Sequence, residues 1–342
     1  ALNQNSVQWI ENGAGTLVNS NTLSPVYTPT SNETGIVMLT LKVAGSYACS
    51  LDTATDSKIL IIDPLPVVNA GNDQSFCASD SYLLSGLQSD CSSYLWATSG
   101  DGSFSNSAVL DPIYTPGSID KSSGSVFLTL SGQGSAQCSS QTDFDQVMLL
   151  IDPMPAVYAG MDDTLCVKDP ILISGASASH YSSVHWTGGD GTFNNPDILS
   201  VVYMPGIVDF TSGTVNLTLT AHGLLTCAQK SVNDIKTLSV TPYPIVFAGT
   251  DDYICSDETQ YQLSANAQHV NNSSVFWTFS GGDGHFNDAT FLNPVYFPGP
   301  IDLTTINRQI IFTLSVNGFD NCAATTVSDE VQLLIDPIPI PD

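Results

Sequence analysis

The chain has 342 residues, and its 33 Asp and Glu against 7 Lys and Arg give a formal net charge of −26. A surface this acidic argues against nucleic acid as a partner, because phosphate binding requires a basic face. The abundance of Ser, Thr, Asn and Gly favours an extracellular β protein, and no apolar run approaches the roughly 18 residues of a membrane span.

The chain opens without a signal peptide, in the middle of a pattern that returns three more times, so we expect it to be a segment of a longer protein. The clearest marker is a tryptophan followed by a glycine-rich turn, and successive tryptophans are 87, 90 and 91 residues apart. The markers are WIENGAGTL at 9–17, WATSGDGSF at 96–104, WTGGDGTF at 186–193 and WTFSGGDGHF at 277–286. Such a period indicates tandem small domains, each with its own core.

Each repeat carries further landmarks in the same order. A proline pair, such as Pro64 and Pro66, precedes Ala-Gly-x-Asp, a cysteine and a short apolar strand. After the tryptophan come Tyr-x-Pro, a long alternating strand, a second cysteine and a closing apolar strand. Two prolines within three residues favour a stiff, extended joint. The joints predict four repeats: 1–63, which lacks its opening strands, 64–152, 153–241 and 242–342.

The long strands alternate between apolar and polar residues. At 214–221, Val215, Leu217 and Leu219 point to one side and the polar residues between them to the other, as in a half-buried strand. No segment of 11 or more residues has a helical period. Short strands separated by Gly, Pro and Asn turns are typical of a sandwich. We therefore expect an all-β protein of tandem β-sandwich domains, arranged as an extended rod.

The tryptophans and glycine-rich turns are predicted to be scaffold rather than an active site. Four indoles are expected to fill the cores between the sheets. They are Trp9, Trp96, Trp186 and Trp277. Glycine permits positive φ, so Gly188 to Gly191 would turn the chain while Asp190 bonds the amides of the turn itself. The first repeat has Ala14 where the others have Asp, a change that a turn tolerates better than a catalytic carboxylate would.

The order of Ala-Gly-x-Asp, Cys, Trp, Gly-Asp-Gly, Tyr-x-Pro-Gly, alternating strand, Cys and proline pair resembles one known family. It is similar to the PKD-like, immunoglobulin-like repeats of very large Bacteroidetes surface proteins, and in particular to gliding-motility adhesins of the SprB type. The resemblance covers the whole chain and implies tandem Ig-like or PKD-like β-sandwich domains. The first repeat departs most, with Ala14 in place of Asp and Thr30 in place of Gly.

The resemblance also implies a biological setting. Proteins of this kind are exported by the type IX secretion system, attach to the outer membrane at the cell surface and extend as filaments. The implied partners are the gliding or secretion machinery and, through the parent protein, the substratum or a polysaccharide. O-glycans on Asp-Ser/Thr-aliphatic motifs are implied as well. Thr53 in Asp52-Thr53-Ala54 and Thr164 in Asp163-Thr164-Leu165 match that motif, although ordinary turn residues would look the same.

Eight cysteines in an acidic, exported-looking chain indicate disulfides, and no C-x-x-C zinc spacing occurs. Cys91 has no counterpart in the other repeats, whereas the other seven recur. Pairing within repeats gives Cys77–Cys138, Cys166–Cys227 and Cys255–Cys322. Pairing across the joints gives Cys49–Cys77, Cys138–Cys166 and Cys227–Cys255, each separated by 28 residues that would hold the thiols tens of Å apart if extended. We therefore expect pairing within repeats.

Calcium is the only cofactor that the acidic residues suggest, because calcium binds clustered carboxylates and carbonyls. The candidate ligands are Asp101, Asp190 and Asp283 in the Gly-Asp-Gly turns and Asp120, Asp209 and Asp302 after Tyr-x-Pro-Gly. No D-x-D-x-D-G loop is present, so solvated turn carboxylates are the alternative interpretation. Acids near the joints could also converge from adjacent repeats.

No histidine recurs at a repeat position, and no G-x-S-x-G, P-loop or H-E-x-x-H motif occurs, so we predict no enzyme. The favoured function is a structural stalk segment of a very large cell-surface adhesin, for gliding and attachment. The alternative is an array of carbohydrate-binding modules that grip sugar with exposed aromatic side chains such as Phe279 or Tyr181. An accessory array of a secreted hydrolase is a lesser alternative.

Overall fold

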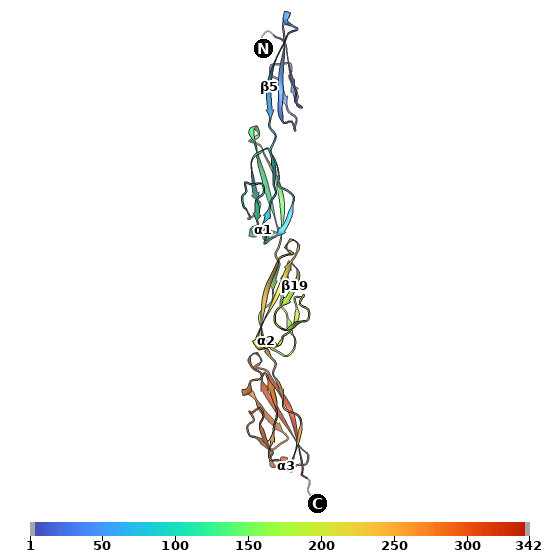
Figure 1. Cartoon of the computed structure of the whole chain (residues 1–342), viewed down its shortest axis with the longest axis vertical. Coiled ribbons are helices and arrows are strands. Elements are labelled where there is room, and N and C mark those ends of the chain that lie inside the picture. The colour runs from blue at the N-terminus through green and yellow to red at the C-terminus, as the bar shows by residue number, and fades with distance from the viewer. Residues whose placement is uncertain (1–3, 339–342) are drawn as a thin grey trace. The chain divides into compact units, whose positions relative to one another are not determined.

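The computed structural model describes residues 4–338, which form strands joined by turns and a few short helical segments (Figure 1). The first repeat contains β1 (Gln4–Glu11), β2 (Thr16–Val18), β3 (Val26–Thr28), β4 (Gly35–Gly45), the 3-10 turn η1 (Tyr47–Cys49) and β5 (Thr53–Ile62). Strands β1, β4 and β5 form one antiparallel sheet, and β2 pairs with β3.

The second repeat supplies a complete set of strands. They are β6 (Val67–Asn69), β7 (Gln74–Cys77), β8 (Tyr82–Leu83), β9 (Leu87–Ser89), β10 (Cys91–Thr98), β11 (Ser103–Phe104), β12 (Ile113–Thr115), β13 (Ser125–Gly134) and β14 (Thr142–Asp152), with helix α1 (Ser118–Ser123) and turn η2 (Ala136–Cys138). One sheet has the order β10-β13-β14-β7, a smaller one has β11-β12-β8, and β6 pairs with β9.

The third repeat has the same topology. Its elements are β15 (Ala156–Tyr158), β16 (Asp163–Val167), β17 (Ile171–Ile173), β18 (Ser177–Ser179), β19 (Tyr181–Thr187), β20 (Thr192–Phe193), β21 (Val201–Met204), α2 (Ile207–Ser212), β22 (Thr214–Gly223), η3 (Leu225–Cys227) and β23 (Ser231–Pro242). The large sheet has the order β16-β23-β22-β19, and the small one has β17-β21-β20.

The fourth repeat follows the same plan. It contains β24 (Ile245–Phe247), β25 (Asp252–Cys255), β26 (Tyr261–Gln262), β27 (Asn266–Gln268), η4 (Asn272–Ser274), β28 (Phe276–Ser280), β29 (His285–Phe286), β30 (Val295–Phe297), α3 (Pro300–Thr304), β31 (Arg308–Asn317), η5 (Asp320–Cys322) and β32 (Thr326–Asp336). Its large sheet has the order β25-β32-β31-β28.

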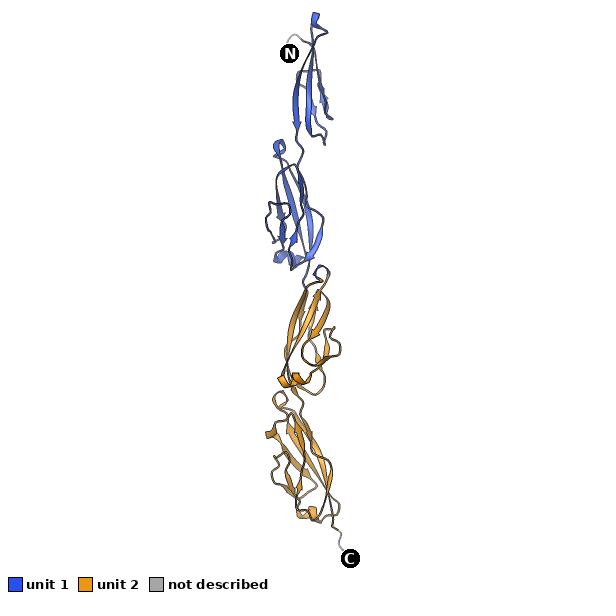
Figure 2. Ribbon diagram, viewed as in Figure 1, with its two compact units in different colours: residues 1–154, 225–227 blue, residues 155–224, 228–342 orange. Residues whose placement is uncertain are grey.

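Contacts divide the chain into two compact units (Figure 2). The first contains residues 1–154 together with Leu225–Cys227, and the second contains the remainder. Three separate apolar cores lie within the predicted repeats 64–152, 153–241 and 242–342. Each core takes side chains from both the large and the small sheet, as in a sandwich. The all-β, tandem β-sandwich fold expected from the alternating strands is confirmed.

The three later tryptophans lie in these cores. Trp96, Trp186 and Trp277 are 1–2% exposed, and each indole N–H donates at 3.1–3.2 Å to a backbone carbonyl of the loop that precedes β12, β21 or β30. Trp9 differs from the prediction, because it is only half-buried and its Nε1 has no partner among the described residues. Among residues 4–63, no strand corresponds to β6, β7 or β8 of the second repeat, so no such strand packs against the Trp9 ring.

The three short helices were not expected from the sequence. Helices α1, α2 and α3 have 6, 6 and 5 residues, which is too short to show a helical period. Each begins after the glycine of Tyr-x-Pro-Gly, and an aspartate at its third position accepts that glycine's amide. This capping contact is the local signal that marks them.

Candidate functional site

Two aspartates and a tyrosine lock the start of each helix to the Gly-Asp-Gly turn. In the third repeat, Tyr203 Oη donates to Asp209 Oδ2 at 2.5 Å, and the amides of Gly206 and Asp190 donate to the same carboxylate at 3.0 and 3.2 Å. In return, the Asp190 carboxylate accepts the amides of Val208 and Asp209 at 2.9 Å. We call this reciprocal set the Tyr–Asp lock.

The lock recurs in the neighbouring complete repeats. Its members are Tyr114, Asp120 and Asp101 in the second repeat and Tyr296, Asp302 and Asp283 in the fourth. The inner carboxylates are 0–4% exposed, and their oxygens face N–H and O–H donors. The turn aspartates therefore bond amides of a helix 18 or 19 residues further along, a contact that the sequence did not predict.

The first repeat has a modified lock. Glu33 stands where the others have the inner aspartate, and it accepts the Tyr27 hydroxyl at 2.5 Å and the Ala14 amide at 2.7 Å. The outer carboxylate is absent because Ala14 occupies its position. No helix follows Tyr27 in this repeat. A side chain that caps helix amides in the other repeats has nothing to cap here, so alanine is tolerated.

Hydrogen bonding and burial shift the acidity of these groups in opposite directions. Amide donors from the following helix hold the pKa values of the Asp101 and Asp190 carboxyls below 3.8. Burial, reinforced by the Asp120 carboxylate, raises the pKa of Tyr114 to about 12. Burial also works to raise the pKa of Asp302, but hydrogen bonds from Tyr296, Gly299 and the Asp283 amide, with Arg308, outweigh it and hold that pKa low. These shifts follow from the hydrogen bonds within the lock and from its burial.

The glycine after the turn aspartate is required by crowding. A Cβ at Gly191 would lie 2.1 Å from the Met204 carbonyl oxygen and 2.6 Å from Tyr203 Oη. Positive φ occurs earlier in the same turn, at Gly188 with 113°. The glycines thus let the turn approach the tyrosine, whose hydroxyl accepts the Gly191 amide at 3.0 Å.

The six predicted calcium ligands therefore come together in pairs, but their oxygens are occupied by protein donors. Across residues 4–338, no group of three or more His, Cys, Asp or Glu side chains gathers as a metal site would require. The acids near the joints also act within one repeat, because Asp162 accepts the Thr237 amide at 2.7 Å and Asp234 accepts the Ala159 amide at 2.8 Å. Equivalent bonds recur in the second and fourth repeats.

The joints carry a second recurrent contact, in which a cysteine-bearing 3-10 turn sits on the end of the preceding closing strand. Within the first unit, Thr226 of η3 donates its amide and its hydroxyl to Asp152 Oδ2 at 3.1 and 2.6 Å. Turn η2 likewise donates the Gln137 amide to Asp63 Oδ2 at 3.0 Å. In the second unit, Asn321 of η5 bonds Ser239 at 3.1 Å.

Disulfides close two of these joints, and they overturn the predicted pairing. Cys77 bonds Cys227 and Cys166 bonds Cys322, each with a Cα–Cα distance of 4.9 Å. The expected pairs Cys77–Cys138, Cys166–Cys227 and Cys255–Cys322 do not form, and neither do the pairs 28 residues apart. The first cysteine of one repeat therefore bonds the turn cysteine of the next.

The sheet geometry explains why pairing within a repeat fails. Cys77 lies beside Asp152 in the parallel pair β7–β14, at the end of the second repeat from which the chain continues into the third. Cys138 follows the opposite end of the ten-residue strand β13. At about 3.4 Å per residue, that strand places the two thiols on the order of 30 Å apart. A disulfide needs Cα atoms at about 5–6 Å.

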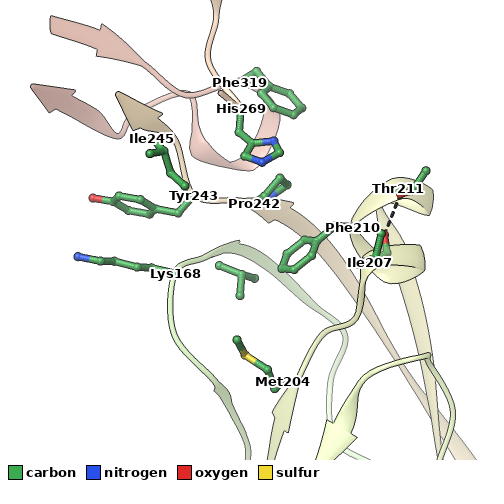
Figure 3. A pocket seen from close by; sticks show the side chains of 11 residues that line it. Lys168, Met204, Ile207, Phe210, Thr211, Pro242, Tyr243, Ile245, His269 and Phe319 are labelled. Carbon is green, nitrogen blue, oxygen red and sulfur yellow. Dashed lines mark hydrogen bonds between the residues drawn. The ribbon is translucent and has the colours of Figure 1, made fainter. Parts of the chain in front are cut away.

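An apolar cavity of about 630 Å³ lies within the second unit, next to the joint between the third and fourth repeats. Met204, Ile207, Phe210 and Ile245 contribute to its lining. Figure 3 shows the rings of Phe210, Tyr243, His269 and Phe319 around it. Lys168 Nζ lies 5.2 Å from the centre of the Tyr243 ring.

The remaining candidate residues lie apart from these sites. Thr53 begins β5 and Thr164 lies in β16, and both are exposed. Asp163, beside Thr164, forms an ion pair at 2.7 Å with Lys236, whose side chain is buried and also donates to the Met161 carbonyl. Cys91 is a free thiol whose pKa is raised by burial.

The aromatic side chains proposed for sugar binding pack into cores. Phe279 forms edge contacts with Phe286 and Tyr296, with ring centres 5.5 and 5.1 Å apart, and Tyr181 packs against the core of the third repeat. Neither side chain lines the apolar cavity.

No family model matches this chain. No curated protein sequence matches it either. Among solved structures, it is similar to extracellular cadherin domains 1–4 of protocadherin gamma B7, with 10% identity, a TM-score of 0.44 and coverage of 96% of this chain and 91% of that one. The I-band fragment I67–I69 of titin has 12% identity, a TM-score of 0.46 and coverage of 80% and 99%. Mouse cadherin-23 domains EC22–24 have 11% identity, a TM-score of 0.39 and coverage of 81% and 100%.

Within residues 4–338, none of the helices has the length and apolar character needed to cross a membrane.

Proposed function

We propose that the chain is a structural stalk segment of an extracellular, cell-surface adhesin. The observation that carries the proposal is the pair of disulfides, Cys77–Cys227 and Cys166–Cys322, each of which joins one predicted repeat to the next. A catalytic or transport protein has no evident need for such links, whereas a stalk under tension does. Disulfides also favour an oxidising, extracellular environment.

The domain assignment belongs to the same proposal. Each of the repeats 64–152, 153–241 and 242–342 has its own core and the same strand order, so we take each as one domain. The repeat 1–63 is a partial domain of the same kind. The locks and joints recur from repeat to repeat, which supports a role in which each domain contributes length.

The finer assignment rests on the sequence resemblance to the PKD-like repeats of gliding-motility adhesins of the SprB type. On that basis the parent protein is exported by type IX secretion, is attached to the outer membrane and links the gliding machinery to the substratum or a polysaccharide. Thr53 and Thr164 are the proposed glycan sites, and both hydroxyls are on exposed residues. Mass spectrometry of the protein from its native host tests those two sites.

Single-molecule pulling tests the stalk role. With both disulfides intact, the shortest covalent path from residue 77 to residue 322 runs back from 227 to 166 and contains 61 residues instead of 245. At roughly 3.4 Å per residue, reduction should lengthen the fully unfolded chain by about 600 Å. A reduced chain and an oxidised chain with the same contour length would contradict the proposal. The double variant Cys77→Ser/Cys166→Ser is the matched control and should not respond to reductant.

One observation favours the second candidate, a carbohydrate-binding array. The apolar cavity places Tyr243, Phe210 and Phe319 around one opening, and sugars bind against such rings (Figure 3). Calorimetric titration with cell-wall polysaccharide fragments tests it. Saturable binding that Tyr243→Ala abolishes would support this function, and heat changes equal to those of dilution would remove it.

A further inference from the structure

The two disulfides define a rule for the repeating cysteines. The first cysteine of a repeat lies at or next to the end of its parallel strand, beside the end of the closing strand: Cys77 lies beside Asp152, and Cys166 lies beside Thr241. The turn cysteine of the following repeat sits on that end and bonds it. The partners are 150 and 156 residues apart in sequence.

Three unpaired cysteines occupy the same positions as the bonded ones: Cys49 and Cys138 end a 3-10 turn, and Cys255 ends a parallel strand. Of the two turn cysteines, Cys138 is the one that follows a closing strand of a preceding repeat among the described residues. The rule places the partner of Cys138 about 150 residues earlier, before residue 1, and the partner of Cys255 about 150 residues later, beyond residue 342. We infer that Cys138 and Cys255 are open halves of joints, each built to form a disulfide with another repeat of this kind. Cys138 takes a cysteine-bearing strand along β5, and Cys255 takes a cysteine-bearing turn on Asp336.

Cys138 makes the same contacts with the preceding closing strand as its disulfide-bonded counterpart Cys227 does. Its Sγ lies 3.5 Å from the Asp63 carbonyl oxygen, and Cys227 Sγ lies 3.4 Å from the Asp152 carbonyl oxygen. The Gln137 amide bonds Asp63 just as the Thr226 amide bonds Asp152. This joint therefore needs only a strand that carries the second thiol.

The sheet beside Cys138 has an open place for that strand. Strands β14, β23 and β32 each pair with a parallel strand, which is β7, β16 or β25. The last or next-to-last residue of each of these parallel strands is a cysteine. Among the described residues, strand β5 pairs only with β4. Leu60 and Ile62 are half-buried, whereas their counterparts Leu149 and Ile151 are 0% and 2% exposed.

The strand that would pair with β5 can be described from the three strands that occupy the equivalent position beside β14, β23 and β32. They read QSFC at 74–77, DTLCV at 163–167 and DYIC at 252–255. Each presents an apolar residue immediately before its cysteine. The edge beside β5 therefore suits a short parallel strand of this type, with its cysteine opposite Asp63.

Cys255 presents the complementary half. It lies opposite Asp336 in the parallel pair β25–β32, in the register in which Cys77 lies opposite Asp152. The Ser256 amide donates to the Asp336 carbonyl at 2.9 Å, as Ala78 does to Asp152. The thiol is exposed and unbonded.

The bond forms by thiol–disulfide exchange with a small-molecule disulfide such as oxidised glutathione. Two protein thiols lose two protons and two electrons as the S–S bond forms, and one small disulfide is reduced to two small thiols. The inference rests on the proposed function of the joints as covalent links. The experiment distinguishes failure of this inference from failure of the proposed function, because the bonds Cys77–Cys227 and Cys166–Cys322 serve as internal references.

The test restores this strand in the full chain. A copy of residues 64–87 is fused to the N-terminus at Ala1, so that the copied Cys77 lies where the rule expects the partner of Cys138. The unmodified chain has four free cysteines. After refolding with oxidised glutathione and removal of mixed disulfides at exposed positions, three free thiols per chain are expected, with a peptide linking the grafted cysteine to Cys138. Five free thiols, or a graft bonded elsewhere, would overturn the inference.

A serine in place of the grafted cysteine is the matched control. It should dock, shifting the emission of the half-exposed Trp9 to the blue, yet leave four free thiols. A graft that neither shifts Trp9 nor bonds Cys138 means that the edge is not a strand site. For the other half, a second copy of residues 242–342 is joined directly after Asp336, in place of residues 337–342, so that the proline pair at the joint is not duplicated. Its turn cysteine should bond Cys255, and a free Cys255 would refute this half. Absence of the two reference bonds as well would instead reject the proposed function.

Discussion

The hydroxyl of Tyr203 donates to the buried carboxylate of Asp209 over 2.5 Å and accepts the amide of Gly191 at 3.0 Å. One phenol thereby holds a turn, a helix start and a strand together. The same tyrosine–aspartate bond recurs around Tyr114 and Tyr296, in the other two complete repeats.

Removing this hydroxyl should destabilise the third repeat. Tyr203→Phe leaves Asp209 and the Gly191 amide each without one partner, and an unsatisfied buried group costs roughly 1–3 kcal/mol. Chemical denaturation followed by tryptophan fluorescence measures the change. Tyr158→Phe is the control, because Tyr158 is 47% exposed, and its stability should match that of the parent chain. Equal stability of both variants would show that the lock contributes nothing.

Stability should fall at both ends of the pH range. The pKa values of Asp101 and Asp190 are held below 3.8, so their contribution is complete above that pH and is lost as the pH falls through the lower folded values. The pKa of Tyr114 is raised from 10.0 to about 12, so its contribution is complete below pH 10 and is lost as the pH rises through 12. Thermal melts across this range should show a plateau between the two losses. A melting temperature that peaks at acidic pH would contradict the assignment.

Added calcium should leave the melting temperature unchanged. The carboxylate oxygens of the six aspartates that suggested a calcium site accept hydrogen bonds from amide and hydroxyl donors. A cation would have to displace these hydrogen bonds. Melts with millimolar calcium, compared with magnesium at the same ionic strength, provide the check. A calcium-specific rise of several degrees would restore the metal-site interpretation.

Lys236 should be replaceable by a residue of similar shape. Its side chain is 2% exposed and pairs with the half-exposed Asp163. Lys236→Met removes one partner of the pair, but the Asp163 carboxylate is half exposed and water can solvate it, so the unfolding free energy should change by less than about 1 kcal/mol. Lys236→Ala loses the packed stem as well and should cost about 2–4 kcal/mol. Urea denaturation separates the two variants, and a larger loss for methionine than for alanine would reverse the argument.

The sequence predicted the sandwich fold because a period of two residues directly reports which side of a strand is buried. Val215, Leu217 and Leu219 are all at most 2% exposed. The prediction for Trp9 failed because a local motif does not reveal whether the facing strands are present. The short helices were missed for a related reason, since six residues cannot display a period of 3.6.

The cysteine pairing could not be obtained by counting. Spacing along the chain treats Cys77 and Cys138 as members of one repeat, whereas strand direction places them at opposite ends of it. The six aspartates illustrate the opposite case. The sequence showed that these aspartates recur in pairs. It could not show that backbone amides, and not a cation, face their carboxylate oxygens.

The disulfide-closed loops 77–227 and 166–322 overlap between residues 166 and 227. A protease that cuts a single peptide bond anywhere from 77 to 322 therefore produces two pieces that a sulfur bridge still holds together. Such a nick does not release either piece. A chain linked in this way tolerates isolated cleavage and comes apart only when a reductant acts too, or when a second cut frees a bridge.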